Sequence, residues 1–364
     1  MKCICDRAAL SEALTATSGV TLTRTPKPIL ECVRLTAADD VLTLTAYDQE
    51  MGLRFRLPEV EITSPGETLV KGERLAAIVR ESSDETLAFE VVDDTLHIRG
   101  NDSHFQVYGQ DVREFPPVPE LEGDPDFVVK LGVIRGLIER TLFAAARENT
   151  RYAINGVLFE KEGKILRLVA TDGRRLAMST ATLEKAVGDD IEAIIPTKPL
   201  GLLGRLHLDA DADIEIKVST NQVILRSERV TISSVLIEGR FPKYRDVMPK
   251  DLNKKIELKT AEVLSAVKRA ALLTNEESKG IRVHLSSEGM VLSSRAPEQG
   301  EATIRLPVQY SGETLEIGFN PTFLIDAMKV CGDTTTLELQ APAKPGLLRS
   351  DPDFVYVVMP VNLS

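Results

Sequence analysis

The sequence predicts an α+β protein built from three tandem copies of one unit, with helices on one face of antiparallel sheet. Three observations predict it. A run of alternating apolar residues recurs at a fixed spacing, helical segments stand before and after each run, and a Phe-Pro pair ends each of the first two copies. Strands and helices that segregate in this way favour an α+β layer arrangement. We expect domains at residues 1–120, 121–245 and 246–364.

The alternating runs are the clearest repeated element. They begin at Val41, Ile165 and Met290, and the alternation is typical of a half-buried strand. Within the runs, Ala46, Ala170 and Ser294 are each separated by 124 residues. Self-similarity at one period is the signature of a repeated fold.

Helical segments flank each run. Ahead of the runs, apolar residues three and four apart indicate helices at Leu10, Ala13 and Leu14 after Asp6, at Ile134, Leu137 and Ile138, and at Val263, Val267 and Ala270. Thr260 is the expected N-cap of the last of these. Shorter helices are expected at residues 75–80, 200–205 and 323–328, and further strands at 95–99, 223–226 and 346–349.

The copies end at Phe115-Pro116 and Phe241-Pro242, and proline interrupts both helices and strands. A proline-rich linker over residues 116–125 strengthens the first boundary. If each copy packs edge to edge on the next, the contact is head-to-tail. Such contacts generate closed rings or open filaments.

Composition describes a folded, non-membrane protein. Hydrophobic residues make up 43% and charged residues 27% of 364 residues, enough for several cores. No long apolar segment is present, so we expect a cytoplasmic location. The four cysteines lack a CxxC pair, and we expect reduced thiols, with Cys3 and Cys5 buried on one face of a strand.

The net charge of −11 counts against nucleic-acid binding unless basic residues gather on one surface. The first 120 residues carry 12 Lys+Arg against 21 Asp+Glu, whereas residues 121–245 carry 19 against 18. These counts are therefore compatible with an acidic exterior that surrounds a basic interior.

Residues that could perform chemistry are scarce. His97, His104, His207 and His284 are scattered, and no nucleophile elbow, Walker motif or GxGxxG loop occurs. Residues 209–213 imitate the start of a calcium loop, but its required glycine and glutamate are replaced by Ile214 and Thr220. We expect an acidic turn there, no metal and no cofactor. A hydrolase using Asp172 is an alternative that lacks an accompanying base or nucleophile.

Four segments, residues 169–177, 238–249, 317–320 and 356–361, together with Arg151-Tyr152 and Asn155-Gly156, resemble the bacterial replicative sliding clamp, the beta subunit of DNA polymerase III. The resemblance spans the chain. It implies a clamp fold that closes, as a head-to-tail homodimer, into a six-unit ring around duplex DNA, with helices lining the hole. It also implies a non-catalytic processivity factor whose partners, namely the replicative polymerase, the clamp loader, repair polymerases and ligase, bind through short linear peptides.

The resemblance assigns site residues. The expected DNA contacts are basic residues on or near the inner helices: Arg24, Arg74, Arg80, Arg147, Arg151, Tyr152, Lys198 and Arg205, with Lys268 and Arg269 as further basic residues. The expected dimer contacts are Arg74, Phe105, Leu272, Leu273 and Glu298. A monomeric binding module that keeps the peptide cleft but forms no ring is the second hypothesis.

The expected partner-peptide cleft is apolar with a polar rim. Its residues are Ile154, Thr171, Gly173, Arg174, Arg175, Leu176, Pro242, Val247, Asn320, Phe323, Val357, Val358, Met359, Pro360 and Val361. Two departures from the family pattern put the peptide preference in doubt: Asp246 replaces a basic residue, and the chain ends Asn362-Leu363-Ser364.

Overall fold

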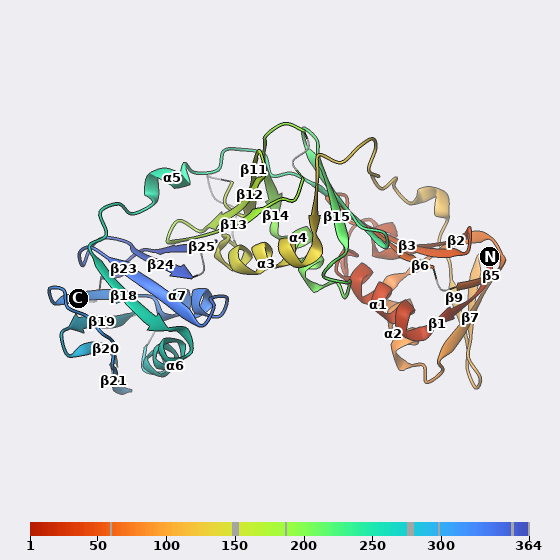
Figure 1. Cartoon of the computed structure of the whole chain (residues 1–364). Coiled ribbons are helices and arrows are strands. Elements are labelled where there is room, and N and C mark those ends of the chain that lie inside the picture. Colours follow the sequence, from red (N-terminus) through yellow and green to blue (C-terminus); the bar gives the residue numbers. More distant parts are fainter. Residues whose placement is uncertain are drawn as a thin grey trace. The chain divides into compact units, whose positions relative to one another are not determined.

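The computed structural model describes residues 1–58, 60–147, 153–185, 188–274, 280–297, 299–350 and 353–362. One order of elements recurs three times along the chain: a strand, a helix, four or five strands, a second helix and three strands (Figure 1). The three predicted copies and the α+β class are therefore confirmed.

The first copy contains β1 (Lys2–Asp6), α1 (Arg7–Ser18), η1 (Pro28–Glu31), β2 (Cys32–Ala38), β3 (Val41–Tyr47), β4 (Met51–Leu57), β5 (Val60–Ser64), β6 (Gly66–Lys71), α2 (Gly72–Glu81), β7 (Thr86–Val92), β8 (Thr95–Arg99), β9 (His104–Tyr108) and η2 (Val112–Glu114).

The second copy contains β10 (Phe127–Lys130), α3 (Leu131–Thr141), η3 (Leu142–Ala144), β11 (Gly156–Glu162), β12 (Ile165–Thr171), β13 (Arg175–Thr182), β14 (Ile191–Pro196), α4 (Thr197–Arg205), β15 (Asp213–Val218), β16 (Gln222–Arg226) and β17 (Val230–Val235).

The third copy follows α5 (Tyr244–Val247) and contains β18 (Lys254–Lys259), α6 (Thr260–Ala271), β19 (Ile281–Ser286), β20 (Gly289–Ala296), β21 (Gly300–Leu306), β22 (Leu315–Phe319), α7 (Pro321–Met328), β23 (Thr334–Leu339), β24 (Gly346–Ser350) and β25 (Phe354–Val358).

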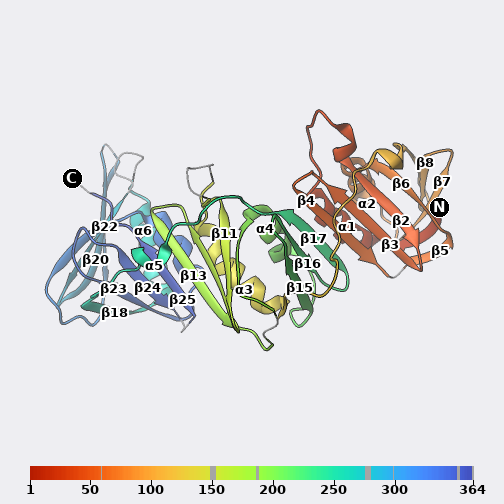
Figure 2. The same cartoon turned by 90° about the horizontal axis from the view of Figure 1, so that it is seen from above.

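The fold divides into two compact units. The first comprises residues 1–134, 185–189 and 198–236, and holds a five-stranded sheet in the order β5-β1-β7-β8-β9 and an eight-stranded sheet in the order β10-β15-β16-β17-β4-β3-β2-β6. Figure 2 shows β2, β3, β4 and β6 side by side. Within this unit, β17 of the second copy pairs with β4 of the first, so a single sheet crosses the copy boundary.

The second unit comprises residues 135–184, 190–197 and 237–364. Its eight-stranded sheet has the order β14-β11-β12-β13-β25-β24-β23-β18, and its four-stranded sheet has the order β21-β20-β19-β22. Here β25 of the third copy pairs with β13 of the second. The two eight-stranded sheets therefore have the same construction, strand for strand.

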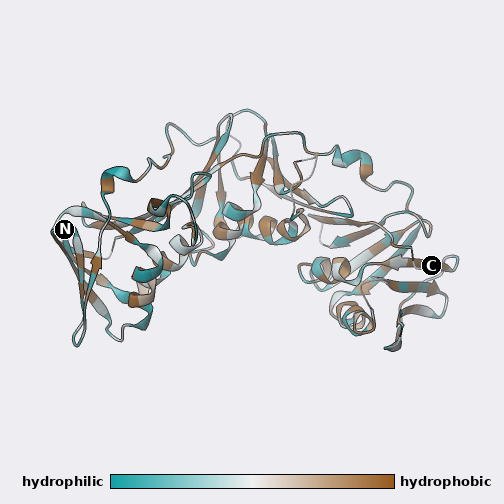
Figure 3. Ribbon diagram, turned by 180° about the vertical axis from the view of Figure 1, so that it is seen from behind, coloured by the Kyte–Doolittle hydropathy of each residue, from teal (hydrophilic) through white to brown (hydrophobic). Residues whose placement is uncertain are grey.

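Side-chain alternation explains how each sheet is covered. In β3, Leu42, Leu44 and Ala46 are fully buried, while Thr43 points to the opposite face. Because alternate residues of a strand face opposite sides, the apolar side lies against α1, which packs on β3 and β4. Figure 3 shows apolar and polar residues alternating along the strands.

The first helices of the second and third copies bury the same spacing of residues. The buried positions are Leu131, Ile134, Leu137, Ile138 and Thr141 in α3, and Thr260, Val263, Ala266, Val267 and Ala270 in α6. This shared stripe aligns the two helices residue by residue. Phe143 and Leu272 both stand two residues beyond the last buried position, and are therefore copy-equivalent, meaning that they occupy the same place in two copies.

The expected N-cap at Thr260 is wrong. Lys259 is the N-cap of α6, and Thr260 is its first helical residue. The Thr260 hydroxyl is hydrogen-bonded at 2.8 Å to the Thr335 hydroxyl of β23, so tertiary pairing replaces capping. In α1, Asp6 is the cap, because its carboxylate accepts a 2.7 Å hydrogen bond from the Ala9 amide.

The cysteine prediction is confirmed for β1. Cys3 and Cys5 are each 1% exposed, their sulfurs lie 3.8 Å apart, and both are free thiols. The pKa of the Cys5 thiol is raised by its hydrogen bond with Cys3 and by burial, which keeps it protonated and unreactive. Among the described residues, none of the helices combines the length and apolar character needed to cross a bilayer.

Candidate functional site

The predicted peptide residues gather in the second unit, where the end of the chain runs beside β13. Arg175 pairs with Val358 and Leu176 with Val357 along the antiparallel ladder. Beyond the strand, the Met359 amide donates a 2.9 Å hydrogen bond to the Arg174 carbonyl. Residues about 180 positions apart in the sequence are thereby fixed side by side.

An apolar cluster lies beneath this junction. Leu176 and Val357 belong to it, together with Ala153, Leu158, Val169, Ile194, Tyr244, Leu347 and Val355. Met178, Ile237, Phe241, Met248 and Leu252 are only partly buried against it. Next to these, Val247 is 55% exposed and Met359 is 43% exposed. Exposed apolar side chains beside an apolar cluster favour contact with a ligand.

The turn between β12 and β13 is shaped by its own side chains. The Thr171 hydroxyl donates to the Arg175 carbonyl at 2.6 Å and accepts from the Gly173 amide at 3.1 Å. Gly173 has φ of +84°, a conformation that disfavours other residues although no atom lies within 4 Å of an added Cβ. The turn therefore presents Gly173 and Arg174 on the surface.

Asp172 has a structural role in this turn. Its carboxylate accepts hydrogen bonds from the amides of Arg174 at 2.9 Å and Arg175 at 3.0 Å, and forms an ion pair with the Arg175 guanidinium. These bonds make an Asx turn, which explains the residue without any catalytic task.

Arg175 connects β13 to α7. Its guanidinium pairs with Asp326 at 2.9 Å and lies over the Phe323 ring at 4.5 Å, and its side chain is 9% exposed. Burial lowers the pKa of Arg175, but the hydrogen bond to Asp326 and the interactions with Tyr356 and Asp172 together outweigh burial and hold that pKa above its ordinary value. This arginine positions Phe323 and is not a free charge at the rim.

The remaining predicted residues border the same region. Asn320 caps α7 by accepting from the Thr322 amide at 2.9 Å, and the Val361 amide donates to the Gly318 carbonyl at 2.9 Å. Ile154 is 6% exposed, and the Pro242 carbonyl accepts from the Tyr244 amide in a short turn. Pro360 follows Met359 and is partly exposed. Leu363 and Ser364 lie outside the described residues.

Sequence reasoning missed a polar group beneath the linker that follows Phe241. The Tyr244 hydroxyl donates to Glu160 at 2.5 Å, and the same carboxylate pairs with Arg167 at 2.9 Å and Arg245 at 3.1 Å. Burial, and then the bond to Glu160, raise the pKa of Tyr244 to about 12. In the sequence, Glu160 and Arg167 resemble ordinary charged residues on the exposed face of a strand. Their burial follows only from Tyr244, which covers them in the folded protein. Asp246 lies nearby and is exposed.

Comparison with known proteins decides the family. Models of the DNA polymerase III beta subunit match the N-terminal domain at residues 1–119, the central domain at 129–243 and the C-terminal domain at 245–362. The chain belongs to the DNA polymerase III beta subunit family. It is a DNA sliding clamp, a non-catalytic processivity factor of DNA replication.

Individual relatives agree along their whole length. The beta sliding clamp of Pseudomonas aeruginosa is 32% identical over 362 residues, covering 98% of this chain and 99% of the relative. That of Escherichia coli is 31% identical over 374 residues, with full coverage of both. Solved clamps from Bacillus subtilis and from P. aeruginosa bound to griselimycin match with TM-scores of 0.94 and 0.93 at 27% and 32% identity, covering all of both chains.

The expected DNA contacts of this sliding clamp stay predictions, but the structure locates most of them. Arg74 and Arg80 are exposed on α2, Lys198 and Arg205 on α4, and Arg24 in the loop after α1. Lys198 forms an ion pair with Asp48, and Arg80 pairs with its neighbour Glu81. Arg147 is exposed after η3, and Lys268 and Arg269 are exposed on α6, whereas Arg151 and Tyr152 lie outside the described residues.

The expected dimer contacts of the clamp include Arg74, which is exposed on α2, and three apolar residues. Phe105 on β9 is 39% exposed and Leu272 at the end of α6 is 77% exposed. Leu273 is half-buried beside Gly300 of β21. Glu298 lies outside the described residues.

Two histidines meet in a way that their sequence spacing did not suggest. His97 on β8 and His104 on β9 have ring nitrogens 3.0 Å apart and stacked rings. Among the described residues, no group of three potential metal ligands forms, here or elsewhere. The residues at 209–213 form an exposed turn in which Asp209 accepts from the Asp211 amide, as expected.

Proposed function

We propose that this sliding clamp closes as a head-to-tail homodimer into a ring of six units around duplex DNA. In this proposal, the three domains are residues 1–120, 121–245 and 246–364, and the ring works in the cytoplasm. The observation that carries the proposal is a pair of strand edges without partners in the described part of the chain. They correspond to the edges that pair between successive copies inside the chain.

The matching edges follow from strand order. Within the chain, the last strand of one copy pairs with the third sheet strand of the copy before it, as β17 does with β4 and β25 with β13. The corresponding strands without such a partner, among the described residues, are β9 and β21, which end the five- and four-stranded sheets. Unpaired edges expose backbone donors and acceptors and invite another strand. Pairing β9 with β21 of a second copy would repeat the internal contact.

The exposure of Phe105 supports the same pairing. On the last strand of each copy, the residues that pair with an arginine of the preceding strand are copy-equivalent: His104 pairs with Arg99, Thr231 with Arg226 and Val355 with Arg349. One residue further on, Phe105 corresponds to Ile232 and Tyr356, which are 1% and 0% exposed. Only Phe105 lacks a neighbouring copy to cover it.

The proposed DNA contacts are Arg24, Arg74, Arg80, Arg147, Arg151, Tyr152, Lys198 and Arg205. The described residues of this set are exposed. Guanidinium and ammonium groups bind phosphates without reading sequence, which suits a protein that slides. The proposed partners of the peptide site are the replicative polymerase, the clamp loader, repair polymerases and ligase. The griselimycin complex of the related P. aeruginosa clamp supports ligand binding by this family.

The test compares DNA topologies. The clamp is loaded on a nicked circular duplex by a clamp loader, separated by gel filtration, and the bound fraction is measured before and after the circle is cut once. Retention on the circle and release after linearisation are expected for encirclement. Equal retention on both forms would contradict the ring. A sedimentation experiment that finds only monomer would favour the monomeric binding module.

A further inference from the structure

The first unit contains a counterpart of the peptide site with the opposite chemistry. Because both eight-stranded sheets have one strand order, the pairing lists align them residue by residue. Thr45 precedes Ala46 and pairs with Arg34 and Arg54; Val169 precedes Ala170 and pairs with Leu158 and Met178.

Across the copy boundary, Arg54 pairs with Thr231 just as Met178 pairs with Val355. The apolar strip Leu158, Val169, Met178 and Val355 is thus replaced by Arg34, Thr45, Arg54 and Thr231.

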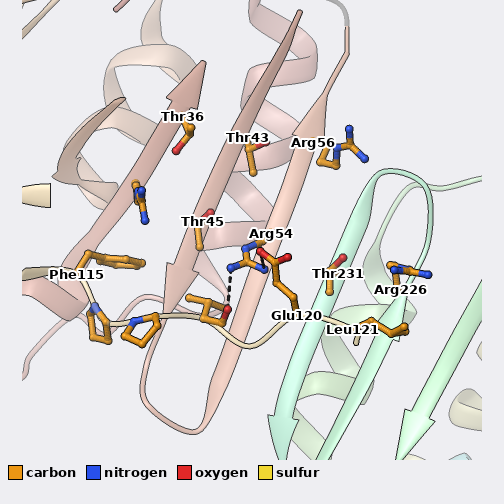
Figure 4. A pocket seen from close by; sticks show the side chains of 14 residues that line it. Thr36, Thr43, Thr45, Arg54, Arg56, Phe115, Glu120, Leu121, Arg226 and Thr231 are labelled. Atoms are coloured by element: carbon orange, nitrogen blue, oxygen red, sulfur yellow. Dashed lines mark hydrogen bonds and ion pairs between the residues drawn. The ribbon is translucent and has the colours of Figure 1, made fainter. Parts of the chain in front are cut away.

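A pocket lies over this polar strip. The linker of residues 115–121 crosses the outer face of β2, β3, β4 and β17, and encloses a volume of about 590 Å³ (Figure 4). Four arginines and one glutamate line it, namely Arg34, Arg54, Arg56, Arg226 and Glu120. We call this the linker pocket. Its positive lining contrasts with the net charge of −11 on the chain.

The arginines of the linker pocket are only partly neutralised. Arg54 is 23% exposed, donates to the Val118 carbonyl at 2.7 Å, and pairs at 2.5 Å with Glu120, whose side chain is 70% exposed. Burial, with Arg34 close by, lowers the pKa of Arg54 although Glu120 opposes the shift. Desolvated guanidinium groups favour a carboxylate over water.

The other arginines border the same space. Arg34 pairs with Glu67 at 2.5 Å and Arg226 pairs with Glu215, both carboxylates standing outside the pocket lining. For Arg56, which is exposed, the described residues offer no side-chain partner. Among the described residues, the Arg56 guanidinium thus has no ion-pair partner, and Arg54 forms its one ion pair with Glu120 of the exposed linker.

We propose that the linker pocket binds an acidic, extended peptide segment of a partner protein. Carboxylates of the peptide would pair with Arg56 and replace Glu120 on Arg54, while the threonine hydroxyls of the sheet face offer hydrogen bonds. The wall formed by Phe115, Pro116 and Leu121 suits the apolar side chains of such a segment.

The pocket fits a peptide better than a nucleic acid. Single-stranded nucleic acids bind by stacking bases on exposed aromatic rings. The one aromatic residue of the lining, Phe115, is 7% exposed and packs into a core with Cys32 and Leu69.

The experiment uses the full-length protein and a fluorescein-labelled peptide of alternating Glu and Ala, about eight residues long to match a long strand. Fluorescence anisotropy is expected to show binding that weakens with salt, and no binding of the same peptide with Gln in place of Glu. Arg56→Gln and Arg54→Gln should each weaken binding by about tenfold or more. Arg56 is exposed, so its variant tests the proposal even if Arg54→Gln fails to fold.

Two matched variants give the controls. Arg349→Gln changes the copy-equivalent of Arg226 in the second unit, and Met359→Ala changes the proposed peptide site, so both should leave binding of the acidic peptide unchanged. The proposal is overturned if Arg56→Gln has no effect, if inorganic phosphate alone displaces the peptide, or if oligothymidylate binds the pocket in its place. None of these outcomes bears on encirclement of DNA.

Discussion

The ring of Phe143 packs on the ring of Tyr356, with centroids 5.9 Å apart, at the junction where β25 pairs with β13. Their copy-equivalents are Leu272 and Phe105, which are both exposed. The proposed dimer would bring Leu272 of one protomer onto Phe105 of its partner, and so repeat the Phe143–Tyr356 contact between subunits.

Leu272→Ala is therefore expected to weaken the dimer. Losing a buried leucine side chain costs about 1 to 3 kcal/mol, and a two-subunit ring has two identical seams, so the dimer Kd should rise by roughly 30-fold or more. Sedimentation equilibrium measures it. Val133→Ala, at an exposed valine of α3 outside the seam, should not change the Kd. An unchanged Kd for Leu272→Ala would refute this seam.

The strand register of the seam is predicted as well. Thr303 pairs with Ser293 as Arg54 pairs with Thr45, so His104 should face Thr303 and Gln106 should face Glu301 of the other subunit. The double variant Gln106→Cys with Glu301→Cys should form a covalent dimer under mild oxidation, because facing residues lie within disulfide reach.

A shifted pair is the control for this register. Gln106→Cys with Thr303→Cys places the thiols two residues out of step and should crosslink poorly. Non-reducing gel electrophoresis distinguishes the two variants. Preferential crosslinking of the shifted pair would show that the copy alignment is wrong at this strand.

Met359→Ala is expected to weaken binding of a Leu- or Phe-containing peptide by about 1 to 3 kcal/mol, because the side chain would cover the apolar part of the ligand. Isothermal titration calorimetry gives the Kd. Val235→Ala is a close control: Val235 is its copy-equivalent at the end of β17, is equally 43% exposed, and likewise donates its amide to the opposing turn. Equal effects of the two variants would exclude Met359 from the site.

Tyr244 is expected to make the free energy of unfolding depend on pH in the alkaline range. Its pKa in the folded protein is about 12, above the ordinary value of 10.0, so its stabilising contribution is complete below pH 10 and is lost as the pH rises through 12. Tyr244→Phe should lower the free energy of unfolding by about 1 to 2 kcal/mol at pH 8, and should reduce its fall between pH 10 and 12.

Urea unfolding followed by circular dichroism at several pH values measures this effect. Tyr108→Phe is the control, because Tyr108 is 79% exposed and should leave both quantities unchanged. If Tyr244→Phe shows the same pH dependence as the unsubstituted protein, the bond to Glu160 does not stabilise the fold.

Much of the fold could be predicted because periodicity is a local property. The helices around Leu14, Ile138 and Val267 and the strands around Ala46 and Ala170 have the expected positions. The N-cap at Thr260 was not predicted correctly, because its hydroxyl is used by Thr335, a residue 75 positions away. Cross-strand partners of this kind leave no pattern in the adjacent sequence.

The candidate sites show the same division. The apolar residues of the peptide site lie in sequence motifs, so a resemblance to the family is enough to assign them. The guanidinium of Arg175, by contrast, is held by Asp326 and Phe323, and Glu160 is covered by Tyr244, so their burial depends on distant segments. The linker pocket was also not predicted, since its arginines alternate with apolar residues as ordinary surface charges do.

Within the part of the chain that the structure describes, β9 and β21 each have an edge with no strand partner, which exposes a freshly synthesised chain to unwanted pairing. Each chain carries both edges, so β9 of one chain can pair with β21 of the next. The angle between successive subunits decides whether this pairing closes a ring of two chains or continues as an open fibre. Substitutions that alter this angle, without touching either edge, would convert a sliding clamp into an aggregating polymer.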